Sequence, residues 1–189
     1  TPNGCYNIKD KIMGCSCRPI VGALGRKMIL AEFSFTATTT ALAAGDVIID
    51  GLIKRDLYDL TKGAARLVEY TVEQRHASAP TKKGINAVMY HTAPTSMTTA
   101  IADPDAVSAL DFVKLAGVAK VVTADYVDYT TAAEIISVAS KNIETSALPI
   151  VYNDNDTSPK DIWIKILAGE TMTFGASTLV HIKLWFEIF

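Results

Sequence analysis

The last twelve residues of the chain show the clearest alternation of apolar and polar side chains. In residues 178–189 the even positions from 180 to 188 are all apolar, and the odd positions hold His181, Lys183, Trp185 and Glu187. A period of two is typical of a strand with one buried face, because successive side chains point to opposite sides of a sheet. The pattern predicts a strand with one packed face and one face in water.

A second alternating segment lies just before it, over residues 161–167. Isoleucines occupy 162, 164 and 166, whereas Asp161, Trp163 and Lys165 occupy the other phase. The same period-two argument predicts a half-buried strand here. We expect the isoleucines to lie in the same core as the apolar face of the final strand.

Further short segments rich in β-branched and aromatic residues are bounded by Gly, Asp, Pro or Lys. They cover residues 28–35, 46–50, 66–73, 86–91, 118–122, 134–138 and 149–152. With the two alternating segments they make nine or ten strands at short intervals. The predicted fold class is mainly β, an antiparallel sandwich of jelly-roll-like type.

One segment interrupts the β pattern. Asp103 is suited to cap a helix and Pro104 to occupy its first position, which predicts a short α-helix ending near Gly117. Residues 56–62 favour one further helical turn, more weakly.

The first 27 residues differ from the remainder. They contain scattered Gly, Pro and cations without a period of 2 or 3.6, which predicts an irregular N-terminal arm. Residues 28–189 are then expected to form a single β-rich domain, since 189 residues with 49% hydrophobic content suffice for one sizeable core.

Charge and hydropathy exclude several classes of partner. The formal net charge is −2, so the basic field of a dedicated nucleic-acid binder is missing, and no direct contact with nucleic acid is expected. The longest apolar runs are far shorter than the roughly 20 residues that cross a bilayer, so no membrane contact is expected. No signal segment opens the sequence, and we expect synthesis in the cytoplasm.

No motif of known chemistry is present in the sequence. The three histidines have no metal-ligand spacing, and neither a nucleophile elbow nor a phosphate-binding glycine loop occurs. Cys5, Cys15 and Cys17 are odd in number and unsuited in spacing to zinc, so free thiols are expected. We therefore predict no enzyme activity, no cofactor and no structural metal.

Acidic residues offer two weaker candidates for a site. Asp154 and Asp156 resemble the start of a calcium loop, but Pro159 and Lys165 stand where its glycine and glutamate are required. An Asx-rich turn is the favoured interpretation, with a cation shared between subunits left open. Asp125, Asp128 and Glu134 are interpreted as a solvated rim and not as an acid and base pair.

Seven motifs occur in order from about residue 35 to the C-terminus. They occupy residues 38–47, 63–72, 86–95, 101–106, 115–119, 161–169 and 177–186, including the sequences TTTALAAGDV, NAVMYHTAPT and DIWIKILAG. In this order the chain resembles a family of tailed-phage virion structural proteins, some of them capsid decoration or cement proteins. Within the motifs, Gly45 is suited to a positive φ with Asp46 as cap, Pro94 to ending a strand, and Gly169 to releasing the chain toward the last strand.

The resemblance implies a function by binding alone. A decoration subunit would bind the major capsid protein on the outer surface of the phage head, in the virion, and stabilise the shell by non-covalent contacts. It also implies a homo-oligomer, with a trimer favoured over a dimer. A tail, baseplate or head–tail connector subunit is the alternative, and a small hydrolase is the third class considered.

The arm is the segment we expect to contact the capsid or a neighbouring subunit. Its apolar anchors and cations stand against an acidic body. The candidate contact residues are Tyr6, Ile8, Lys9, Lys11, Ile12, Met13, Arg18 and Ile20. A disordered tail is the alternative interpretation of the same segment.

Overall fold

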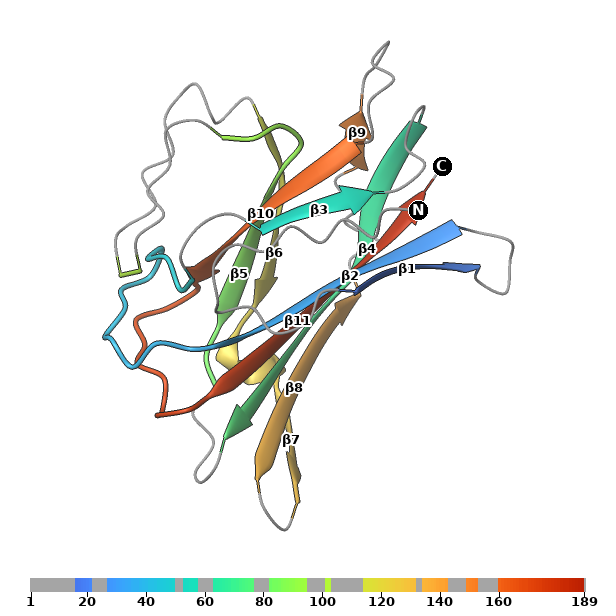
Figure 1. Cartoon of the computed structure of the whole chain (residues 1–189). Helices are drawn as coiled ribbons and strands as arrows, with labels where there is room; N and C mark the ends of the chain where they lie inside the picture. The colour runs from blue at the N-terminus through green and yellow to red at the C-terminus, as the bar shows by residue number, and fades with distance from the viewer. Residues whose placement is uncertain are drawn as a thin grey trace.

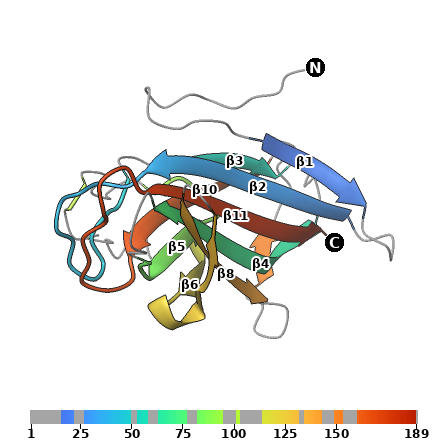
Figure 2. The same ribbon diagram turned by 90° about the horizontal axis from the view of Figure 1, so that it is seen from below.

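Two antiparallel β-sheets pack against each other, as Figures 1 and 2 show from two directions. The computed structural model describes residues 16–21, 27–49, 53–57, 63–76, 82–94, 101–102, 114–131, 134–142, 149–152 and 160–188. Within these residues, strands account for nearly all regular structure. The antiparallel β-sandwich predicted from the sequence is confirmed.

The larger sheet has seven strands and the C-terminal strand near its centre. Its order is β1 (Ser16–Val21), β2 (Lys27–Thr36), β11 (Leu179–Ile188), β4 (Gly63–His76), β8 (Ile135–Asn142) and β7 (Val127–Thr130). The remaining strand, β9 (Pro149–Tyr152), pairs with the first residues of β4, and β8 pairs with the last ones.

The smaller sheet has the order β3 (Ile53–Leu57), β10 (Lys160–Ala168), β5 (Ile85–Tyr90) and β6 (Leu115–Val121). A short 3₁₀-helix, η1 (Thr123–Asp125), follows β6 and leads the chain across to β7 in the larger sheet. The β6–η1–β7 segment therefore joins an edge of one sheet to an edge of the other (Figure 1).

The core is formed by the facing sides of the two sheets. On β11, Ile182 is fully buried and lies opposite Phe33 of β2 on one side and Val72 of β4 on the other. Isoleucines 162, 164 and 166 of β10 belong to the same apolar cluster. The predicted meeting of these two strands in one core is confirmed, although they belong to different sheets and do not pair.

The outer face of the smaller sheet is partly covered, which the alternation in β10 did not indicate. Lys165 was expected on a wet face, yet it has no exposed surface, and Leu167 on the same side is 7% exposed. Val47, Val88 and Tyr90 form a second apolar cluster with Leu167 on this side. This part of the face is therefore buried, and the prediction of a solvated environment was wrong for Lys165.

Most predicted strands are found within a few residues of their expected ends. Residues 46–50 are an exception, because the described part of this segment makes only an isolated bridge, between Val47 and Leu167. Backbone bonds Gly45 N to Ala168 O and Ala168 N to Asp46 O, both 2.8 Å, lay the segment along β10 without a continuous ladder. It extends the side of β10 on which β3 pairs.

The turn at Gly45 has the predicted form. Gly45 has a φ of +92°, and the Ala43 amide donates a hydrogen bond of 2.7 Å to the carboxylate of Asp46. A positive φ is accessible to glycine without a steric penalty, because it has no Cβ. The expected ends of two strands at the motifs with Pro94 and Gly169 are also found, since β5 ends at Tyr90 and β10 at Ala168.

Part of the predicted irregular arm is a strand. β1 pairs antiparallel with β2 at the edge of the larger sheet, where Pro19 is tolerated because an edge strand leaves one row of backbone groups without ladder bonds. Residues 1–15 lie outside the described residues, so the division into arm and body stays a prediction. The local composition did not predict β1, because this strand is formed by pairing with β2 and has no alternating pattern of its own.

The two helical predictions have different outcomes. Most of the helix from Asp103 to Gly117 lies outside the described residues, but its last part was wrong, because Leu115 begins β6 and lies opposite Tyr90. The weaker helical turn at residues 56–62 was wrong at its start, since β3 runs to Leu57. In both places strand pairing overrides the local preference.

Replacing Ile182 tests the buried phase of β11. We expect Ile182→Ala to lower the free energy of unfolding by about 2–5 kcal/mol, because it leaves a cavity between the sheets. Lys183→Ala, one residue along on the half-buried outer face, should change it by less than about 1 kcal/mol. Urea unfolding of both variants measures the difference, and equal losses would contradict the assigned faces.

Candidate functional site

A buried polar junction joins the two sheets near the end of β4. Gln74, fully buried, donates from Nε2 to the carbonyl of Lys83 at 2.7 Å and accepts at Oε1 from the Lys83 amide at 3.0 Å. The side-chain amide thus pairs with both backbone groups of Lys83, as a neighbouring strand would. Because Lys83 lies just before β5, this contact ties the larger sheet to the start of a strand in the smaller one.

Tyr126 completes the junction from the η1–β7 connection. Its hydroxyl donates to the Lys83 carbonyl at 2.9 Å and accepts from Gln74 Nε2 at 2.7 Å. Burial raises the pKa of Tyr126, so its hydroxyl stays a proton donor at every ordinary pH. The group therefore acts as a fixed hydrogen-bonding partner and not as an acid or base.

Glu170, which lies in the β10–β11 connection, binds Gly84, the residue after Lys83. Its carboxylate accepts from the Gly84 amide at 2.9 Å and from the hydroxyl of Thr123 in η1. These hydrogen bonds, that from Thr123 first, lower the pKa of Glu170. Gly169, beside it, packs closely on Gly84, because a Cβ at position 169 would lie 3.0 Å from the Gly84 backbone and would require that backbone to shift.

A second polar group lies beside the junction, on β7, β8 and β4. Asp128 accepts from Lys82 Nζ at 2.8 Å and from the Ser137 hydroxyl at 2.7 Å, and these bonds lower its pKa. His76, 4% exposed, lies near enough to interact with its charge. Burial lowers the pKa of His76, and Asp128 offsets only part of that effect.

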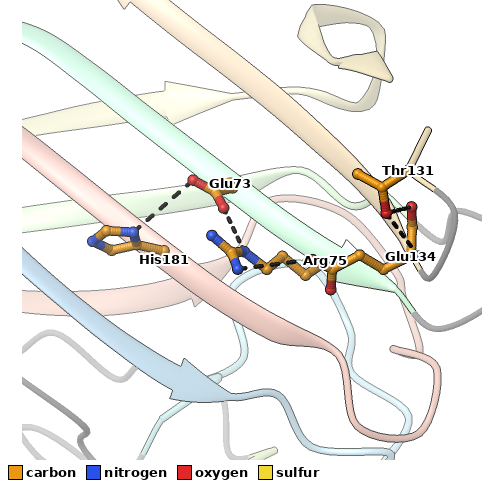
Figure 3. A network of polar contacts seen from close by, with 5 residues as sticks. All are labelled: Glu73, Arg75, Thr131, Glu134 and His181. Carbon is orange, nitrogen blue, oxygen red and sulfur yellow. Dashed lines mark hydrogen bonds and ion pairs between the residues drawn. The ribbon is translucent and has the colours of Figure 1, made fainter. Parts of the chain in front are cut away.

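The outer face of the larger sheet carries a row of acidic and basic side chains on β2, β11, β4 and the β7–β8 hairpin, and Figure 3 shows the part from His181 to Glu134. His181 Nε2 lies 3.4 Å from Glu32, and His181 Nδ1 lies 4.0 Å from Glu73. Arg75 Nε donates to Glu73 at 2.6 Å, and Arg75 also lies 3.8 Å from Glu134. Acidic and basic side chains alternate along this row, so each carboxylate lies beside an arginine or a histidine.

The acidic residues that the sequence analysis had interpreted as a rim do not come together. Asp125 pairs with Lys141 at 2.7 Å, Asp128 with Lys82, and Glu134 with Arg75. Burial alone would raise the pKa of Asp125, but hydrogen bonds from Lys141 and the Val122 amide outweigh it and lower that pKa. Each of the three carboxylates thus lies in a separate ion pair.

The other predicted site residues are only partly placed. Arg18 and Ile20 lie on β1, with their backbones opposite Leu30 and Met28 of β2. The remaining arm candidates, together with Cys5, Cys15, Asp154 and Asp156, lie outside the described residues. Among the residues that the structure describes, no group of three His, Cys, Asp or Glu is arranged to hold a metal ion.

Large exposed apolar side chains gather in one part of the described chain. Val118 is 40% exposed on β6, Val122 is 52% exposed just after it, and Val127 and Tyr129 are each 58% exposed on β7. All four lie on the segment that joins an edge of the smaller sheet to an edge of the larger one. Val118 lies opposite Val88 on the smaller sheet, whereas Val127 and Tyr129 share one face of β7 in the larger sheet, opposite Val138 and Ile136. Neighbouring exposed apolar side chains such as Val127 and Tyr129 are typical of a surface that contacts another protein.

Sequence reasoning missed the junction, although one signal was present. Buried positions on β4 alternate as Tyr70, Val72, Gln74 and His76, so the apolar phase ends in two polar residues. A polar residue in a buried phase predicts a hydrogen-bonded partner nearby. The predicted strand ended at residue 73, which left Gln74 and His76 outside the pattern.

Comparisons with known proteins give no family. No protein-family model and no curated protein matches the chain. A solved structure titled Desmodium yellow mottle tymovirus aligns over 99% of this chain and 95% of its own, with 10% identity and a TM-score of 0.24. A TM-score this low does not indicate a common fold. In the described residues no helix has the length and hydropathy to span a membrane.

Replacing Gln74 tests the junction. We expect Gln74→Leu to lower the free energy of unfolding by about 2–4 kcal/mol, because it leaves the Lys83 backbone and the Tyr126 hydroxyl short of buried partners. Arg75→Gln, which removes an exposed ion pair one residue along, should cost less than about 1 kcal/mol. Chemical denaturation compares the two, and a Gln74→Leu loss no larger than the control would contradict this role.

His76 predicts a dependence of stability on pH. Its pKa is lowered in the folded state, so the unfolded chain takes up a proton first as the pH falls through about 6.5. The free energy of unfolding should therefore decrease from about pH 7.5 to about pH 5.5, above the range where carboxylates titrate. His76→Gln should flatten this decrease. Denaturation midpoints across this range measure the slope, and a variant that kept the wild-type slope would contradict the assignment.

Proposed function

We propose that this chain is a structural subunit of a phage virion, a decoration protein that binds the outer surface of the head and stabilises the shell by non-covalent contacts. The order of seven motifs in the sequence supports the class of protein. The structural observation that supports a contact function best is the pair of exposed apolar side chains, Val127 and Tyr129, on one face of the edge strand β7. Its partners would be the major capsid protein and further copies of the chain.

The arrangement of charges supports the same proposal. The acidic groups described above are held in ion pairs or hydrogen bonds, and the polar junction holds backbone groups of the chain itself. These interactions make a sandwich with fixed sheet edges and leave the exposed apolar residues for a partner. A subunit that works by binding energy alone requires these two properties.

Binding to shells tests the proposed function. Purified protein incubated with emptied, expanded shells made from the major capsid protein of the same phage should bind to saturation at a fixed ratio of copies. Electron microscopy of the complex should show density over the whole head. Density confined to the tail or to one vertex would support a tail or connector subunit, and absence of binding to any part of the virion would overturn the proposal.

A truncation tests the arm. Because Ser16–Val21 forms β1, the informative deletion removes residues 1–15 and keeps the sheet intact. We expect the truncation to weaken shell binding by about ten-fold or more, since Tyr6, Ile8 and Met13 are removed. A matched full-length variant, Lys9→Glu with Lys11→Glu, separates charge from apolar contact. Unchanged affinity and stoichiometry of the truncated protein would show that the arm makes no contact.

A further inference from the structure

The edge strand β7 has one partner within the described part of the chain. It pairs with β8 on one side, and its other side ends the larger sheet. All four of its residues are exposed. Val127 lies opposite Val138 and Tyr129 opposite Ile136, so apolar side chains cover the outer face beside this edge. An edge of this kind presents backbone donors and acceptors that suit another strand.

The other four edge strands contain residues that discourage strand addition. β1 contains Pro19, β9 contains Pro149, β3 contains Lys54 and Arg55, and β6 contains an exposed Lys120. Proline, lysine and other charges are the usual means by which proteins protect sheet edges. β7 has no Pro, Lys or Arg, and its one charged side chain, Asp128, is bound to Lys82 and Ser137 of its own chain.

Symmetry limits how two copies of β7 could pair. In an antiparallel pair related by a two-fold axis perpendicular to the sheet, opposite residues share a face, so the axis passes beside one residue. An axis at Asp128 would set two carboxylates opposite each other, which is unfavourable. An axis at Tyr129 sets the two tyrosines opposite each other and Asp128 opposite Thr130 of the partner subunit, with no like charges facing.

We propose that β7 pairs antiparallel with β7 of a second copy of this chain, about a two-fold axis at Tyr129. The occupant is a second copy because this register is self-complementary: aromatic meets aromatic, carboxylate meets hydroxyl, and Val127 meets Thr131 of the partner subunit. The result is a dimer in place of the trimer that the sequence resemblance favours. The proposal is independent of shell binding and applies to the purified protein.

The β7 contact is short, so the dimer should depend on concentration. A four-residue strand forms few backbone hydrogen bonds, and the apolar side chains Val127 and Tyr129 with their β8 neighbours supply the remaining contact. Sedimentation velocity over a wide concentration range should show a reversible monomer–dimer equilibrium for the wild-type chain.

Charge substitution at Tyr129 tests both the edge and the register. Tyr129→Lys and Tyr129→Glu should each weaken the dimer by about ten-fold or more, because each sets two like charges opposite each other. An equimolar mixture of the two variants should recover dimers, since lysine then faces glutamate. Thr173→Lys, at an exposed position between β10 and β11, is the control and should leave dimerisation unchanged.

Each outcome has a defined meaning. Circular dichroism and thermal unfolding verify that the variants fold. If Tyr129→Lys does not fold, Val127→Lys is used in its place as the single variant. A wild-type monomer at all concentrations, a trimer, or dimers unaffected by either Tyr129 variant would overturn the proposal. Single variants that are monomeric and do not recover on mixing would overturn the axis at Tyr129. The protein could also stay monomeric, with residues 127–131 protected from hydrogen exchange only when shells are added. That result would show that β7 binds a strand of another protein, and it would overturn the proposal of a second copy.

Discussion

The structure depends on burying the inward face of three adjacent strands, β2, β11 and β4. Phe33, Ile182 and Val72 lie side by side across these strands and have no exposed surface. A face of this width is stable only when a second layer covers it, because each apolar side chain left exposed forgoes the favourable free energy of transfer from water to the protein interior. The isoleucines of β10 supply that layer, and the position of the smaller sheet follows from this requirement.

Apolar packing alone does not fix the position of the smaller sheet relative to the larger one. The polar junction fixes it at one end. Hydrogen bonds have preferred distances and directions, whereas apolar contact tolerates sliding. Gln74 binds both backbone groups of Lys83, and Glu170 binds the amide of Gly84. These contacts set the position of β5 relative to β4, and Tyr126 ties the start of β7 to the same residue.

The sequence predicted strands well wherever one face was buried and the other was not. β11 alternates cleanly and β2 is rich in β-branched and aromatic residues, and both were found almost to the residue. β7 was missed because all four of its residues are exposed, so it has no alternation, and β1 was missed because its pairing comes from β2. Lys165 was assigned to the wrong environment because its burial depends on segments distant in sequence, which no local period reports.

The same physical reasoning separates the surfaces of the molecule by their suitability for contact. On the outer face of the larger sheet, Glu73 and Glu134 lie beside Arg75, and a partner docking there would have to remove paired charges from water. Such desolvation is costly and is repaid only by well-matched partner groups. At β7, contact with a partner strand would bury the exposed apolar side chains Val127 and Tyr129 and would give the edge backbone new hydrogen bonds. The strand edge is therefore the surface at which association costs least, and the charged face is suited to remain in solvent.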